Sequence, residues 1–133
     1  MKTRITLLGL LALLVPAVAP AQSTQTETLR DLQSAYKGEA QASTFYKECA
    51  RQALRDGYPD VAKLFRAAAF SEAIHRDNYR EAIRALGAKP ERLPAERPKV
   101  QGTRDNLKES VAKEREQSGV TYPESMRRAH HAG

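Results

Sequence analysis

The 133-residue sequence has one cysteine, no tryptophan and no run in which polar and apolar residues alternate as in a half-buried strand. The single cysteine, Cys49, excludes an intramolecular disulfide and any metal site made of Cys-x-x-Cys pairs. Cys49 lies at helical spacing among apolar residues, so we interpret it as a small buried helix residue, with a disulfide between chains as the alternative. The lack of alternating runs predicts an all-α protein.

Long apolar runs are also scarce, and the main one lies at residues 7–15. Lys2 and Arg4 precede it, and small residues follow it up to Ala21. This order is typical of a secretory signal peptide over residues 1–21, and the run is too short to span a membrane. We therefore expect cleavage after about Ala21, a mature protein without a membrane segment, and a periplasmic or secreted location.

The formal net charge is +6, and the basic excess gathers in residues 89–99 and in Arg127 and Arg128. Aromatic residues do not interleave with these basic residues, and no nucleic-acid-binding motif is visible. The pattern therefore indicates a solvated basic surface, and we expect no nucleic-acid partner.

Helical spacing of apolar residues predicts a first helix over residues 27–55, after a loose polar segment at 22–26. Residues 56–59 read Asp-Gly-Tyr-Pro, a turn in which the glycine ends one helix and the proline begins the next. A second helix then runs over residues 59–86 and stops at Gly87. So short a connection predicts an antiparallel helical hairpin.

Residues 88–102 hold three prolines and no apolar periodicity, which predicts an extended connection long enough to run the length of a bundle. Thr103 is a good N-cap for a third helix, and Pro123 should kink or end it. Residues 124–133 are expected to form a short basic tail. The predicted domain, residues 27–123, is thus a helical bundle with three main helices, which leaves part of its apolar surface open.

Ionisable residues interrupt the apolar side of each predicted helix. Glu72 and His75 are three residues apart, so they project from one side of the second helix. Burying a charge there is unfavourable unless something compensates it, and a bound metal ion is one such compensation. Carboxylates with imidazole suit iron or manganese and can also bind zinc, whereas the alternative is ordinary exposed or paired charges. The apolar side of the second helix consists of Val61, Leu64, Phe65, Ala68, Tyr79, Ile83 and Leu86.

Three segments resemble the rubrerythrin family. Residues 31–42 contain its Gly-Glu-x-x-Ala core, residues 64–75 contain its Glu-x-x-His motif, and a third-helix glutamate is followed by Tyr122-Pro123. The resemblance implies a ferritin-like di-iron protein that reduces hydrogen peroxide to water with electrons from an external donor protein. It also implies that the metal ligands are Glu39, Glu72, His75 and Glu114, and that Tyr46 and Tyr122 are catalytic residues that hydrogen-bond to ligand carboxylates.

The sequence departs from the family pattern at several positions. Lys113 stands where a glycine is usual, and Gln117 stands where many members have a further glutamate. A fourth helix with its own Glu-x-x-His motif and a rubredoxin domain are not recognisable, so we read the chain as a short form. His130 and His131 are adjacent and point in different directions from a helix, which favours tail residues over ligands.

These features leave three functions open: a di-iron peroxidase, a ferritin-like protein that binds or sequesters metal without turnover, and a helical interaction module whose site has lapsed. One hairpin supplies half of a di-iron ligand set. We therefore expect a homodimer related by a two-fold axis, in which Glu39, Glu72 and His75 of each chain share one two-metal site.

Overall fold

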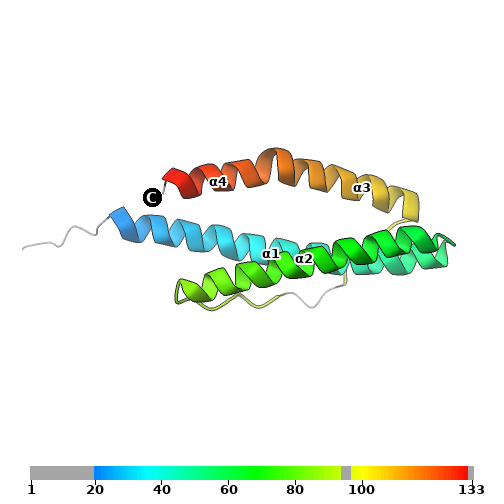
Figure 1. Cartoon of the computed structure of the whole chain (residues 1–133), viewed down its shortest axis with the longest axis horizontal. Helices are drawn as coiled ribbons and strands as arrows, with labels where there is room; N and C mark the ends of the chain where they lie inside the picture. Colours follow the sequence, from blue (N-terminus) through cyan, green and yellow to red (C-terminus); the bar gives the residue numbers. More distant parts are fainter. Residues whose placement is uncertain (1–19, 94–96, 132–133) are drawn as a thin grey trace, which may run out of the picture.

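The computed structural model describes residues 20–93 and 97–131, with side-chain surroundings for residues 25–93 and 97–130. All regular structure in these residues is helical, which confirms the predicted all-α class. The elements are α1 (Pro20–Arg55), α2 (Pro59–Ala85), α3 (Thr103–Glu116), a π-helical segment η1 (Gln117–Thr121) and α4 (Tyr122–His131), as Figure 1 shows. Among the described helices, none is long and apolar enough to cross a membrane.

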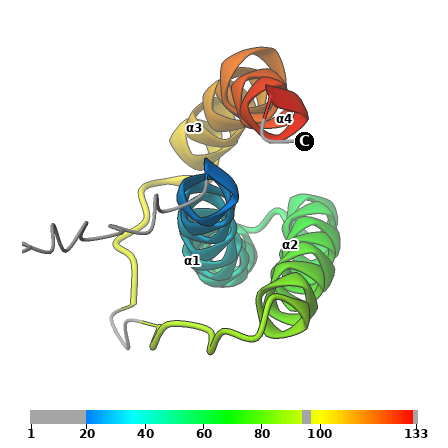
Figure 2. The same ribbon diagram turned by 90° about the vertical axis from the view of Figure 1, so that its left-hand side faces the viewer.

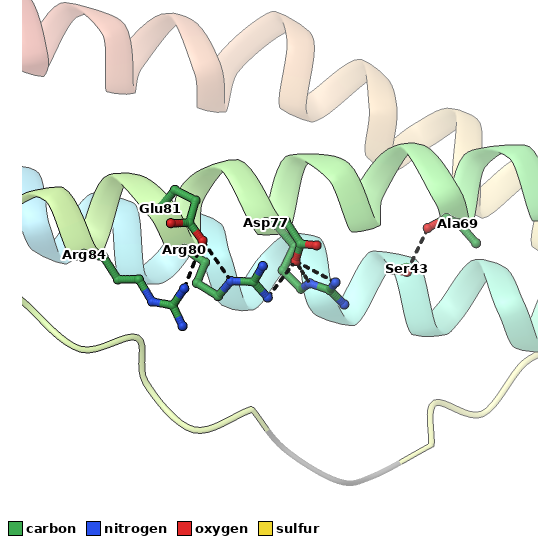
Figure 3. Close-up of polar contacts among 7 residues, drawn as sticks. Ser43, Ala69, Asp77, Arg80, Glu81 and Arg84 are labelled. Atoms are coloured by element: carbon green, nitrogen blue, oxygen red, sulfur yellow. Dashed lines mark hydrogen bonds and ion pairs between the residues drawn. The ribbon is translucent and has the colours of Figure 1, made fainter.

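Helices α1 and α2 form the expected antiparallel hairpin, and most of the tertiary packing lies between them. Gly57 adopts a positive φ of 82° in the turn, a conformation that glycine tolerates without strain, and Pro59 begins α2. Small residues let the two helices approach closely, and the Ser43 hydroxyl donates a 2.8 Å hydrogen bond to the Ala69 carbonyl (Figure 3). The core consists of Phe45, Tyr46, Cys49, Ala50, Ala53, Ala62, Phe65 and Ala69.

Helix α1 begins at Pro20, earlier than the expected start at residue 27. The segment 22–26, expected to be loose, is therefore helical. Its residues contain no glycine or proline, and Pro20 is favourable in the first turn of a helix. Most of the predicted signal peptide, residues 1–19, lies outside the described residues.

The expected inward side of α2 was partly wrong. Phe65 and Ile83 are buried as predicted, but Leu64 is 60% exposed and Leu86 is 37% exposed. The apolar residues of α2 cover more of the helix than the part that contacts α1. The remaining ones border an open corner between α2 and the α3–α4 segment. Figure 2 shows this corner between α2 and the α3–α4 segment, which packs against α1 instead of α2.

The connection between α2 and α3 runs back along the hairpin, as predicted (Figure 1). The amide of Gln33 fixes its start, since Nε2 donates to the Lys89 carbonyl at 2.7 Å and Oε1 accepts the Glu91 N–H at 2.9 Å. Lys37 adds an ion pair to Glu91 at 2.7 Å. The connection lies on the side of α2 toward which Arg80 and Arg84 point (Figure 3).

The start of α3 is tied to the hairpin turn by Asp56. Its Oδ2 accepts the Thr103 backbone N–H at 2.9 Å and the Thr103 hydroxyl at 2.6 Å. These two hydrogen bonds lower the pKa of Asp56. Thr103 was expected to be the N-cap but is the first helical residue, after Gly102 as N-cap. A distant carboxylate thus satisfies the helix end that a local hydroxyl was expected to satisfy.

The third helix does not end at Pro123, and the expected tail continues it as α4. Just before this proline the helix widens into the π-helical segment η1, where the Tyr122 N–H donates to the Gln117 carbonyl five residues earlier. Proline has no N–H and its ring clashes with the carbonyl four residues before it in a regular helix. A wider turn relieves that clash, so the chain remains helical on both sides.

Candidate metal centre

Glu39 of α1 and Glu72 and His75 of α2 come together in the middle of the hairpin. Each offers one ligand atom, and these atoms lie within 4.8 Å of one another. His75 Nδ1 is 3.0 Å from Glu72 Oε2, as expected for residues three apart on one helix. We call these three residues the Glu39 cluster. They are three of the four ligands that the sequence predicts.

The Glu39 cluster is buried on its carboxylate side and open at its histidine. Glu39 is 2% exposed and Glu72 is 7% exposed, whereas the His75 side chain is 48% exposed. Burial, followed by the neighbouring Glu72 carboxyl group, raises the pKa of Glu39 to about 7. Glu39 Oε2 is buried without a hydrogen-bond partner. Two carboxylates, an imidazole and an unpartnered buried oxygen fit a divalent cation such as iron, manganese or zinc.

Two tyrosines hydrogen-bond to predicted ligand carboxylates, as the sequence led us to expect. The Tyr122 hydroxyl donates to Glu39 Oε1 at 3.0 Å, and the Tyr46 hydroxyl donates to Glu114 Oε1 at 2.5 Å. The two pairs are reciprocal, because each of the two antiparallel segments contributes one tyrosine and one glutamate. Burial and then these hydrogen bonds raise the pKa of both tyrosines, which therefore remain donors at neutral pH.

The π-helical segment makes this reciprocity possible. Glu39 and Tyr46 are seven residues apart, about two turns of α-helix, so they share a side of α1. Glu114 and Tyr122 are eight residues apart and would diverge by roughly 80° in a regular helix. The wider turn at η1 takes up the extra residue, so both side chains reach α1.

Glu114 lies apart from the Glu39 cluster in this structure. It is exposed on α3, and its described contact at the site is the hydrogen bond from Tyr46. His130 is an exposed residue of α4 and does not belong to the cluster. The His131 side chain lies outside the described surroundings.

Cys49 is fully buried in the core and forms no disulfide. Burial raises the pKa of its thiol to about 12, so it stays neutral. Its interpretation as a buried helix residue is confirmed. Lys113, at the position of the usual glycine, lies 4.2 Å over the Phe45 ring and pairs with Glu109 at 2.7 Å. Its side chain therefore covers the core surface beside the site.

Tyr79, for which the sequence predicted no site role, lines the same cleft as Glu39. The cleft has a volume of about 440 Å³ between α1 and α4, and its wall includes Leu32, Tyr122 and Met126. Burial and the nearby Glu39 charge raise the pKa of Tyr79. Tyr79 lies seven residues after Glu72, about two helical turns along the same side of α2, and this spacing could have predicted its place near the cluster.

Comparison with known proteins places this geometry in a family. The family model described as Rubrerythrin matches residues 31–133. The chain is also 35% identical over 66 residues to reverse rubrerythrin-1 of Clostridium acetobutylicum, a stretch that covers 50% of this chain and 36% of the relative. The chain thus matches little more than a third of that relative's length. No solved structure gave a significant match. The family match covers most of the sequence and all three residues of the Glu39 cluster, and the chain belongs to the rubrerythrin family.

Proposed function

We propose that this protein is an exported, rubrerythrin-like di-iron protein that reduces hydrogen peroxide with electrons from an external donor protein. The reaction consumes one peroxide, two electrons and two protons and yields two water molecules. Iron bound at the Glu39 cluster would supply the two electrons, and a redox protein would restore them.

The observation that carries the proposal is the buried Glu39 carboxylate with an unpartnered oxygen beside Glu72 and His75. A buried carboxylate oxygen without a hydrogen-bond partner is unfavourable, so its presence between α1 and α2 favours a bound cation. The donor atoms are two carboxylate oxygens and an imidazole nitrogen, a set that suits iron. Manganese and zinc are the alternative metals.

The tyrosines would orient the carboxylates during turnover. The Tyr122 hydroxyl holds Glu39 Oε1, which leaves Oε2 for a metal. The Tyr46 hydroxyl holds Glu114 Oε1 on the neighbouring helix. Hydrogen bonds of this kind to ligating carboxylates fix their orientation and tune their basicity. A molecule as small as hydrogen peroxide could enter by the cleft that Glu39 and Tyr122 line.

A second candidate function, metal binding without turnover, is favoured because the described residues bring together three ligand groups, half of a di-iron set. A lapsed site in a helical interaction module is less consistent with the buried, unpartnered oxygen of Glu39. Iron binding would separate the first two functions from the third, and peroxide reactivity would separate the first from the second.

The experiment is an anaerobic peroxide titration of the iron-loaded, chemically reduced protein. The proposal predicts consumption of one peroxide for every two electrons stored, with oxidation of the iron followed by absorbance. Glu72→Ala, which removes a cluster carboxylate, is the inactive control. Iron that stays reduced during the titration would contradict peroxide reduction and leave metal binding as the function.

Export is tested separately. Cell fractionation with antibody detection should find a mature protein in the periplasm or medium, with an N-terminus near residue 22. Replacing the apolar residues at 10, 11 and 13 with aspartate should retain the precursor in the cytoplasm. A full-length cytoplasmic protein in the wild type would contradict export.

A further inference from the structure

One side of α2 is largely open in the described chain, although Val61 and Ala68 on it also pack against the core. Stepping alternately by three and four residues from its first turn defines this side, which we call the open seam. Leu64 on the seam is 60% exposed, and the His75 side chain is 48% exposed. Alternating steps of three and four are the spacing of a helix side that packs against another helix. The open seam consists of Val61, Leu64, Ala68, Ser71, His75, Asn78, Ala82 and Ala85.

The composition of the open seam is unusual for a surface that faces solvent. None of its eight residues is lysine, arginine, aspartate or glutamate, although α2 contains five basic and four acidic residues. The charged residues Asp77, Arg80 and Arg84 point instead toward the connection between α2 and α3 (Figure 3). A solvent-facing helix side normally carries such charges. The open seam is therefore suited to contact with another helix.

The third helical segment of the chain does not cover the open seam. Figure 2 shows α3 and α4 against α1, with the corner beside α2 unoccupied by the described helices. Val111 lies three residues before Glu114 on α3 and is 51% exposed. An occupant that packs on the open seam would contact His75, whose side chain is 48% exposed.

The Glu39 cluster identifies what the occupant must supply. Each chain brings together two carboxylates and one imidazole, and Glu39 Oε2 has no partner. A di-iron carboxylate site in a helical bundle uses four carboxylates and two histidines. A second copy of the cluster would supply the remaining two carboxylates and one histidine of such a site.

We propose that two copies of this chain associate through the open seam around a two-fold axis, and that each contributes Glu39, Glu72 and His75 to one shared two-metal site. A two-fold interface brings the same surface of both copies together, so each seam packs against its equivalent. This inference rests on the proposed function only in that the cluster holds metal.

Charge makes the association metal-dependent. Without metal, the dimer would bring four carboxylates of Glu39 and Glu72 together in a buried site, where like charges disfavour one another. Two divalent cations neutralise those four charges. The protein should therefore be monomeric after metal removal and dimeric with metal, with one ion per chain.

The test is sedimentation equilibrium of the purified protein with manganese(II), with iron(II) under anaerobic conditions, and with EDTA, together with metal analysis. Leu64→Arg introduces a charge into the open seam. Phe70→Arg is the matched control, because Phe70 is 70% exposed on the same helix but outside the seam. We expect Leu64→Arg to raise the dimer dissociation constant with metal by at least about tenfold, since it buries an unpaired charge. Phe70→Arg should not change it, and circular dichroism should show both variants helical.

His75→Ala provides a second variant that leaves the apolar seam intact, and it should abolish the metal-dependent increase in mass. A monomer under all conditions, or a dimer disrupted by Phe70→Arg but not by Leu64→Arg, would overturn the shared site. A metal-dependent dimer that is inert to peroxide would support the shared site and contradict the proposed activity. A monomer that reduces peroxide with two irons per chain would support the proposed activity and contradict the shared site.

Discussion

Tyr122 donates a 3.0 Å hydrogen bond to Glu39, a residue 83 positions earlier in the chain. This contact occupies Oε1 and leaves the buried Oε2 without a partner. It also joins α4 to the middle of α1 beyond the π-helical segment. The position of the ligand carboxylate thus depends on how the chain passes Pro123.

Tyr122→Phe should weaken metal binding without unfolding the hairpin. Loss of the hydroxyl frees Glu39 to rotate, and loss of a hydrogen bond to a ligand typically lowers metal affinity or activity by about 10–100-fold. Competition titration with a chromophoric chelator measures the affinity. Tyr58→Phe, in the exposed hairpin turn, is the control and should match the wild type. Equal affinities in all three proteins would rule out a role for the Tyr122 hydroxyl.

Glu39→Gln should stabilise the metal-free protein, and the gain should grow with pH. The pKa of Glu39 is raised from 4.5 to about 7, so ionisation disfavours the folded state progressively as pH rises between these values. Glutamine removes this loss, which gives about 3 kcal/mol in the free energy of unfolding at pH 8 and little at pH 4.5. Urea unfolding with EDTA at both pH values measures it.

The control for that comparison is Glu48→Gln on the same helix. A hydrogen bond from Arg51 lowers the pKa of Glu48, so neutralising Glu48 should bring no gain at high pH. A Glu39→Gln variant with the same free energy of unfolding as the wild type at pH 8 would show that ionised Glu39 does not destabilise the metal-free protein.

Glu114→Gln should affect metal binding much less than Glu72→Gln. Glu114 lies outside the Glu39 cluster, and a glutamine can still accept the hydrogen bond from Tyr46. We expect the Glu114 variant to stay within about tenfold of the wild-type affinity, the smaller end of effects beyond the ligands themselves. Isothermal titration with manganese(II) compares the two variants. Equal and severe losses would mean that Glu114 is a direct ligand, as the family resemblance implies.

Asp56→Ala should loosen α3 while the hairpin remains folded. The change removes the acceptor of both Thr103 hydrogen bonds, so the first turn of α3 loses its attachment to the α1–α2 turn. Hydrogen exchange should become faster across α3 than in α1 and α2. Asp60→Ala is the control, because Asp60 is an exposed acidic residue nearby that pairs only with Lys63 among its described contacts. Unchanged exchange in α3 would show that other contacts hold it.

Local spacing predicted much of this structure. The Glu72-x-x-His75 pair follows from helical geometry, and Gly57 with Pro59 defines the hairpin. Helix periodicity alone did not show which part of the wide apolar side of α2 meets α1, so Leu64 was wrongly expected to be buried. That choice depends on where α3 packs.

Two other features depend on contacts between distant residues. The attachment of Thr103 to Asp56 joins residues 47 positions apart, which no local capping pattern reveals. The effect of Pro123 was ambiguous, because a proline can end a helix or be accommodated by a wider turn. Only the contact of Tyr122 with Glu39 shows why the widened helix matters for the site.

Iron binding by the Glu39 cluster is measured most directly by anaerobic equilibrium dialysis against iron(II), followed by elemental analysis. The wild type and His130→Ala, which changes a histidine outside the cluster, should retain the same iron per chain. Glu72→Ala and His75→Ala should each lose most of it. Unchanged iron content in both of these variants would contradict the assignment of the metal centre.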